Sequence, residues 1–98
     1  MPSEATPAAI SGEEILSVSA LNRLARQALE QRFPLLWVSG EISNLRRPAS
    51  GHVYFALKDE NAQVDCVMFR NRSQLVPFRL QDGLRVEARA LVTLYEAR

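Results

Sequence analysis

The sequence is short of the residues that disulfide-bonded and membrane-spanning proteins use. It contains one cysteine in 98 residues, so no internal disulfide can form. Cys66 also stands inside an apolar run, and both observations favour a reducing compartment. No apolar run approaches the roughly 18 residues of a membrane span. No basic patch followed by an apolar stretch opens the chain, as it would in a secretory signal. We therefore expect a cytoplasmic protein with no membrane partner.

Residues typical of catalytic and metal sites are equally scarce. His52 is the only histidine, so a His-rich metal site is unavailable, and we recognise no Ser/His/Asp set in the sequence. The sequence has no phosphate-binding glycine loop. Asp59 and Glu60 are adjacent carboxylates, but at a turn such pairs are more typical of solvated residues than of metal ligands. We expect no metal, no cofactor and no catalytic residue in this chain.

The net charge of +1 hides an asymmetry along the chain. Residues 1–18 contain three glutamates and no basic residue, which leaves 12 basic and 8 acidic groups in residues 19–98. Eleven of the twelve basic residues are arginine. Arginine offers a planar fork for phosphate and a flat face for bases, although genome base composition explains the bias equally well. The excess positive charge is compatible with a polyanionic partner.

The first part of the chain is expected to hold a tail and a helix. Residues 1–14 predict a disordered acidic tail, and residues 15–98 a single small domain. Apolar residues recur at helical spacing from Leu21 to Leu29, which predicts a helix over about 19–32 with Ser19 as its N-cap and an end before Pro34. Core packing explains its apolar stripe, and a partner-binding helix is the alternative.

From residue 35 onward the apolar spacing changes to two, which predicts strands. We expect strands over about 35–43, 52–58, 63–70 and 84–95, with Gly40 marking a bulge or sharp bend. The side chains expected to face the core are Leu36, Val38, Ile42, Val53, Phe55, Leu57, Val64, Cys66, Met68 and alternate residues from Leu84 to Leu94. Strands that do not alternate with helices argue against a parallel sheet. The expected fold class is mainly β with one N-terminal α-helix, the strands forming a coiled, mostly antiparallel barrel.

The opposite face of the second and third predicted strands gathers rings and cations. The candidate binding residues are His52, Tyr54, Lys58 and Phe69 on that face, Arg46, Arg47 and Ser50 in the loop over 44–51, and Arg70 and Arg72 beyond the third strand. Exposed rings inside a basic rim are what single-stranded nucleic acid needs, because rings stack on bases and cations follow phosphates. The alternative is that Tyr54 and Phe69 pack beneath a loop or a neighbouring domain.

Several longer stretches carry a more specific resemblance. They are VSALNRLARQALE (18–30), WVSGEISNL (37–45), SGHVYFALKD (50–59), AQVDCVMFR (62–70) and LVTLYEAR (91–98). Together they cover about residues 16–98 and closely resemble the N-terminal domain of exodeoxyribonuclease VII large subunits. The resemblance implies an oligonucleotide-binding (OB) Greek-key barrel that grips single-stranded DNA for an exonuclease. It also implies a catalytic region beyond Arg98 and a small helical partner subunit that binds through the rest of the chain.

The sequence departs at two points from the families that it resembles. An OB barrel has five strands, whereas four are counted before Arg98, so we expect an incomplete barrel, a piece of a longer protein and unpaired edges that could support dimerisation. Residues 54–59 (YFALKD) are also similar to a motif in the anticodon-binding domain of class II aminoacyl-tRNA synthetases. This second resemblance implies that the Tyr54 ring stacks on a base. Their base-reading glutamine falls on Asp65, an acid that would repel phosphates.

A protein–protein interaction module that assembles subunits is the alternative function.

Overall fold

The computed structural model describes residues 10–96 in two units. One unit holds Trp37–Arg89, and the other holds the N-terminal helix with the segment that follows residue 89. Of the predicted tail, residues 1–9 lie outside the described residues, and the rest is exposed with no regular structure beyond one turn. Within residues 10–96, no helix is both long and apolar enough to cross a bilayer.

Helix α1 spans Val18–Arg32. Its N-cap is Ser17, whose Oγ accepts a hydrogen bond from the Ala20 backbone N–H at 3.1 Å. The predicted cap, Ser19, is therefore wrong: Ser17 has the extended backbone that a cap needs, and Ser19 already lies inside the helix. The helix ends at Arg32, and its C-cap Phe33 stands immediately before Pro34, as the sequence indicates.

The segment after the last strand, β4 (Arg85–Ala90), lies along α1 instead of continuing the sheet. Arg26 forms a salt bridge with Glu96 at 3.0 Å, and Asn22 donates to the same carboxylate. One turn further along the helix, Thr93 Oγ1 donates to Glu30 Oε2 at 2.6 Å. The predicted fourth strand is thus too long. It ends at residue 90, because polar side chains of α1 bind the following residues.

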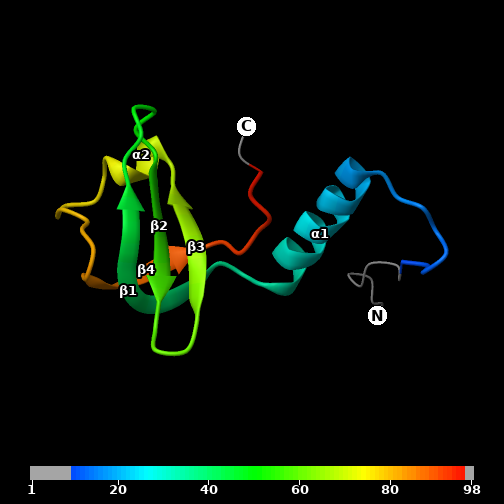
Figure 1. Cartoon of the computed structure of the whole chain (residues 1–98), viewed down its shortest axis with the longest axis horizontal. Coiled ribbons are helices and arrows are strands. Elements are labelled where there is room, and N and C mark those ends of the chain that lie inside the picture. Colours follow the sequence, from blue (N-terminus) through cyan, green and yellow to red (C-terminus); the bar gives the residue numbers. More distant parts are fainter. Residues whose placement is uncertain (1–9, 97–98) are drawn as a thin grey trace. The chain divides into compact units, whose positions relative to one another are not determined.

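Four strands form one sheet in the order β3-β2-β1-β4 (Figure 1). They are β1 Leu36–Arg46, β2 Val53–Lys58, β3 Gln63–Met68 and β4 Arg85–Ala90, and a short helix α2, Arg70–Ser73, follows β3. Neighbours β1/β2 and β2/β3 are antiparallel. The mainly β class with one N-terminal helix is confirmed, α2 being a single added turn. The strands of residues 10–96 are not closed into a barrel.

The core lies against β2. Its buried members are Ile42, Val53, Phe55, Leu57 and Leu80, with half-buried Val38, Leu45, Cys66, Met68, Val76, Leu84 and Val86 packed around them. The predicted burial fails at two positions. Val64 is 55% exposed because it lies on an outer strand, and Ala56, expected outside, is buried because it is small and sits between Ser43 and Asp65 on the neighbouring strands.

Two irregularities shape β1. At Gly40 a Cβ atom would stand 2.8 Å from Leu57 Cγ, so this position serves a close approach of β1 to β2. The shift in the β1–β2 register lies further along, between Ser43 and Arg46, where Asn44 has a φ of 55°. Asp82 Oδ1 accepts the Leu45 N–H there at 3.0 Å, so at the bulge a side-chain carboxylate takes the place of a backbone carbonyl as acceptor.

Candidate nucleic-acid interface

The outward face of β1 and β2 brings together two of the predicted binding residues. The register places Arg46 opposite Tyr54, and the Arg46 guanidinium lies over the Tyr54 ring, 5.6 Å from its centroid. Arg46 is exposed and Tyr54 half-buried. A cation over a ring face gains from the ring quadrupole, so this pair forms one flat, positively charged platform.

A second group of predicted residues meets where the 47–52 loop approaches the end of β3. The rings of His52 and Phe69 pack edge to face with centroids 5.4 Å apart. His52 Nδ1 accepts the Arg70 backbone N–H at 3.0 Å, so in this geometry the ring proton is on Nε2. Phe69 remains 45% exposed. The contact fixes the orientation of both rings beside the first platform.

The 47–52 loop is fastened to α2. Ser73 Oγ donates to the Gly51 carbonyl at 3.2 Å. Gly51 has a φ of +91°, and a Cβ there would meet the Arg70 stem at 2.9 Å, so only glycine fits this corner without strain. Within the loop, Ser50 Oγ accepts the His52 N–H at 3.4 Å. These contacts hold the candidate residues of the loop and of α2 together, and Arg72 of α2 is exposed.

The structure separates two predicted residues from these groups. Arg47 is adjacent to Arg46 in sequence, but its Nη2 donates to the Leu80 carbonyl at 2.6 Å, on the core side of the loop. Lys58 is exposed at the far end of β2, beside the hairpin. Arg46 and Arg47 are thus not equivalent: one covers a ring on the sheet face, and the other supports the loop.

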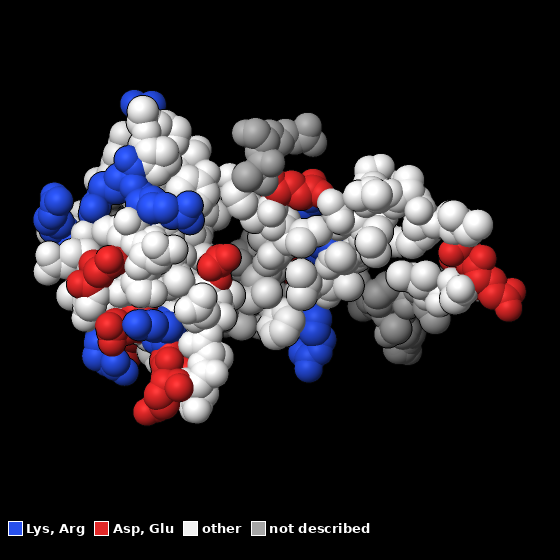
Figure 2. Space-filling view, in the orientation of Figure 1, with Lys and Arg blue, Asp and Glu red and all other residues white. Residues whose placement is uncertain are grey.

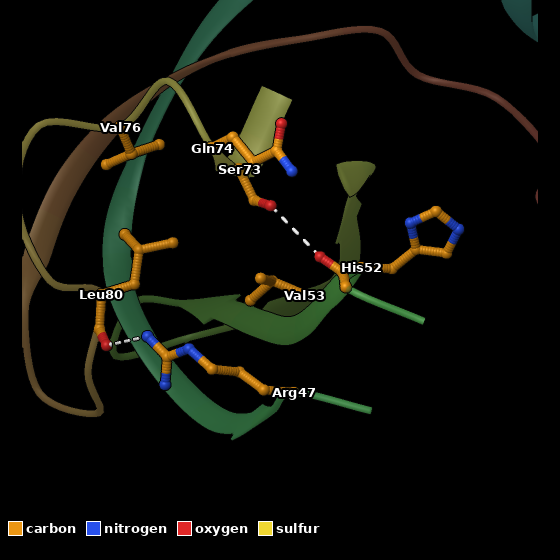
Figure 3. Close-up of a pocket in the computed structure, with 8 residues that line it drawn as sticks. Arg47, His52, Val53, Ser73, Gln74, Val76 and Leu80 are labelled. Atoms are coloured by element: carbon orange, nitrogen blue, oxygen red, sulfur yellow. Dashed lines mark hydrogen bonds between the residues drawn. The ribbon is translucent and has the colours of Figure 1, made fainter. Parts of the chain in front are cut away.

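A cavity of about 280 Å³ opens between the 47–52 loop, α2 and the segment leading to β4. Of the lining residues, Figure 3 shows Val53 near the centre, Val76 and Leu80 on the left, Arg47 below and Ser73 with Gln74 above. The His52 ring points away from the cavity, so His52 contributes backbone there and its ring elsewhere.

Charge is unevenly distributed over the sheet unit. On the side shown in Figure 2, basic side chains gather without acidic neighbours at the end that carries the 47–52 loop, whereas both signs mix at the hairpin end. Asp65 lies on the outward face opposite Ala56. Burial raises the pKa of the Cys66 thiol, and the charge of Asp65 adds to this rise. Among residues 10–96 no group of three His, Cys, Asp or Glu side chains could hold a metal ion.

Sequence reasoning missed a further pair on the outward side of β1 and β4. The Arg89 guanidinium lies 5.4 Å from the centroid of the Trp37 ring, and Trp37 is 65% exposed. Next to it, Arg85 and Glu41 form an ion pair at 3.8 Å. An outward tryptophan in a strand was a visible signal, but its partner depended on how β4 pairs with β1.

Comparison with known families identifies the fold family of this chain. A family model described as an OB-fold nucleic acid binding domain matches residues 16–98. The chain belongs to this family. The OB-fold domain also resembles proteins named exodeoxyribonuclease 7 large subunit. It is 67% identical to that of Nitrosomonas eutropha over 81 residues, 83% of this chain and 18% of the relative. It is 63% identical to that of Thiobacillus denitrificans over 84 residues, which are 86% of this chain and 19% of the relative.

A third relative, from Xylella fastidiosa strain M23, is 56% identical over 86 residues, 88% of this chain and 19% of its own length. The resemblance read from the sequence motifs is thereby confirmed. The OB-fold domain spans just under a fifth of the length of these relatives. OB folds use the face of their second and third strands together with adjoining loops to bind oligonucleotides, which is the region where the rings and arginines above are found.

Proposed function

We propose that this OB-fold domain binds single-stranded DNA across the outward face of β2 and β3 and along the 47–52 loop. The observation that carries the proposal is the Arg46–Tyr54 platform beside the His52–Phe69 pair, on a sheet of an OB-fold nucleic acid binding family. Bases would stack on the Arg46–Tyr54 platform and on Phe69, while the charges of Arg46, Arg70 and Arg72 attract the phosphates. Such binding is tolerant of sequence, because every base has a stacking face.

Within a longer protein, the domain would present the strand to a catalytic region outside residues 1–98. The whole enzyme would be an exonuclease that degrades single-stranded DNA to acid-soluble oligonucleotides in the cytoplasm. Its small subunit would bind elsewhere on the large chain. The relatives' name and the small share of their length that the chain spans support this division of work. In it, residues 15–98 form the binding domain and residues 1–14 a tail.

Salt-dependent fluorescence anisotropy with a labelled poly-dT oligonucleotide tests the proposal. Affinity should fall as salt rises, because phosphate contacts release counterions. Tyr54→Ala should weaken binding about tenfold, since a stacked base contributes roughly 1–3 kcal/mol, with little change in the salt slope. Arg46→Ala should weaken binding and also flatten the slope.

Matched controls separate binding from folding. Tyr54→Phe keeps the ring and should retain most of the affinity. Arg32→Ala removes a similar pair, in which an arginine lies 5.8 Å from the Phe33 ring centroid in the other unit, and should leave DNA binding unchanged. A folded chain that binds no oligonucleotide at low salt would refute the proposal.

Exposed apolar side chains favour a second candidate, assembly with a protein partner. Around the start of α1, Ile15 is 99% exposed, Val18 75% and Leu21 53%. A cluster of this kind is typical of a contact surface. Size-exclusion chromatography with light scattering would show an oligomer that DNA does not alter and that Leu21→Ser dissociates. A monomer at all concentrations would exclude self-association through this helix or through the outer strands.

A further inference from the structure

We propose that the cavity between the 47–52 loop and α2 takes one nucleobase of a bound single strand, splayed out from the stacked bases. The inference rests on the proposed function, because it needs a strand lying across the neighbouring rings. It adds a second kind of site, since the sheet face would stack bases without reading them, whereas the cavity would enclose a single base.

The size and lining of the cavity suit a flat ring. Its volume of about 280 Å³ lies just below the range of roughly 300–1,000 Å³ that holds drug-sized ligands, so one base fits better than a whole nucleotide. Val53, Val76 and Leu80 give its lining an apolar part. Val53 is 5% exposed and Leu80 7%, and half-buried Val76 packs against the same core.

Among the polar side chains that line the cavity, that of Gln74 is the one that makes no hydrogen bond within the described residues. Arg47 is engaged with the Leu80 carbonyl, and Ser73 Oγ with the Gly51 carbonyl, so both maintain the walls. Gln74 lines the cavity, is exposed to solvent and makes no side-chain hydrogen bond within residues 10–96. Its amide offers both a donor and an acceptor, the combination that unstacked bases present on their edges.

The cavity is continuous with the proposed path of the strand. His52 lines it with backbone while its ring turns outward to Phe69, so a base stacked there is separated from the cavity by a single residue of the loop. Arg70 and Arg72 belong to α2, the helix that also holds the cavity-lining residue Ser73. A backbone held by these cations could direct one base inward while its neighbours remain on the rings.

Methyl NMR distinguishes this inference from the function it rests on. The probes are a poly-dT oligonucleotide and an oligonucleotide of equal length with abasic sugars, which keeps the phosphates. At saturation, poly-dT should shift the methyl signals of Val53, Val76 and Leu80, and the abasic strand should not. Gln74→Ala should weaken poly-dT binding about three- to tenfold, the effect of one hydrogen bond. It should not affect the abasic strand or the salt slope.

Leu75→Ala is the matched control, since Leu75 adjoins Gln74 but is 70% exposed and does not line the cavity; its affinity should be unchanged. Poly-dT binding by anisotropy with unshifted cavity methyls, or equal shifts with both strands, would overturn the inference alone. No binding of either strand would overturn the proposed function and the inference together.

Discussion

Gly40 is a position where a single methyl group should be costly. A Cβ atom there would lie 2.8 Å from Leu57 Cγ and 2.9 Å from the Lys58 carbonyl oxygen, both closer than packed atoms tolerate. Leu57 is only 4% exposed, so its side chain has little room to move, and the carbonyl belongs to the β2 backbone. Gly40→Ala must therefore push β1 away from β2.

The magnitude follows from two opposing effects. Overpacking a core by a methyl group costs about 1–3 kcal/mol. Replacing glycine also restricts the unfolded chain, which stabilises by about 0.4–1 kcal/mol. We expect a net loss of about 1–2 kcal/mol in the free energy of unfolding, measured by urea denaturation. In a domain of this size the melting temperature should fall by about 4–8 °C per kcal/mol.

The control is Gly12→Ala, because a Cβ at Gly12 meets nothing within 4 Å; its stability should be unchanged or slightly higher. A second comparison uses Leu57→Ala, which removes one of the two clashing groups. Gly40→Ala should cost less in that background than in the natural chain. Equal stability of Gly40→Ala and the natural chain would refute the close approach of β1 to β2.

Three further measurements test local features. Asn44→Val should lose about 1–3 kcal/mol in urea denaturation, because a β-branched residue is strained at positive φ, whereas Asn44→Gly should lose little. Backbone N–H groups of the hairpin hold the pKa of Asp59 below its ordinary value. The ionised Asp59 carboxylate therefore stabilises the fold above the ordinary aspartate pKa, and this stabilisation is lost as pH falls through the lowered pKa. Asp59→Ala should accordingly destabilise the fold at neutral pH and not in strong acid; equal cost at both would contradict this. Because burial raises the pKa of Cys66, iodoacetamide should alkylate the folded chain more slowly than the urea-unfolded chain at neutral pH, and equal rates would argue against that burial.

Alternation alone predicted much of the sheet. The inward set of β2, Val53, Phe55 and Leu57, is buried, because a period of two is the geometry of a strand and β2 is central. The same rule failed at Val64, since periodicity gives the side of the sheet and not whether a neighbour covers it. It also failed beyond Ala90, where the polar residues of α1 bind the chain, a tertiary contact that no local pattern records.

For the candidate site, the sequence identified residue types but not their partners. Arg46 and Arg47 were indistinguishable as neighbouring loop arginines, yet one covers Tyr54 and the other donates to the Leu80 carbonyl. That carbonyl is 33 positions away along the chain. The contact between His52 and Phe69 likewise depends on β2 and β3 lying in register, which a one-residue slip would destroy.

The difference between the two arginines originates in the bulge of β1. Ser43 faces outward, so strict alternation would put residue 45 outward and residue 46 toward the core. The extra residue at the bulge reverses this order: Leu45 packs against the core and Arg46 emerges opposite Tyr54. A bulge is a known way to redirect a side chain at a functional site. Here Asn44, with its φ of 55°, absorbs the irregularity, and Asp82 accepts the displaced Leu45 N–H. The cation that would contact phosphate is therefore positioned by two residues that would not touch the DNA.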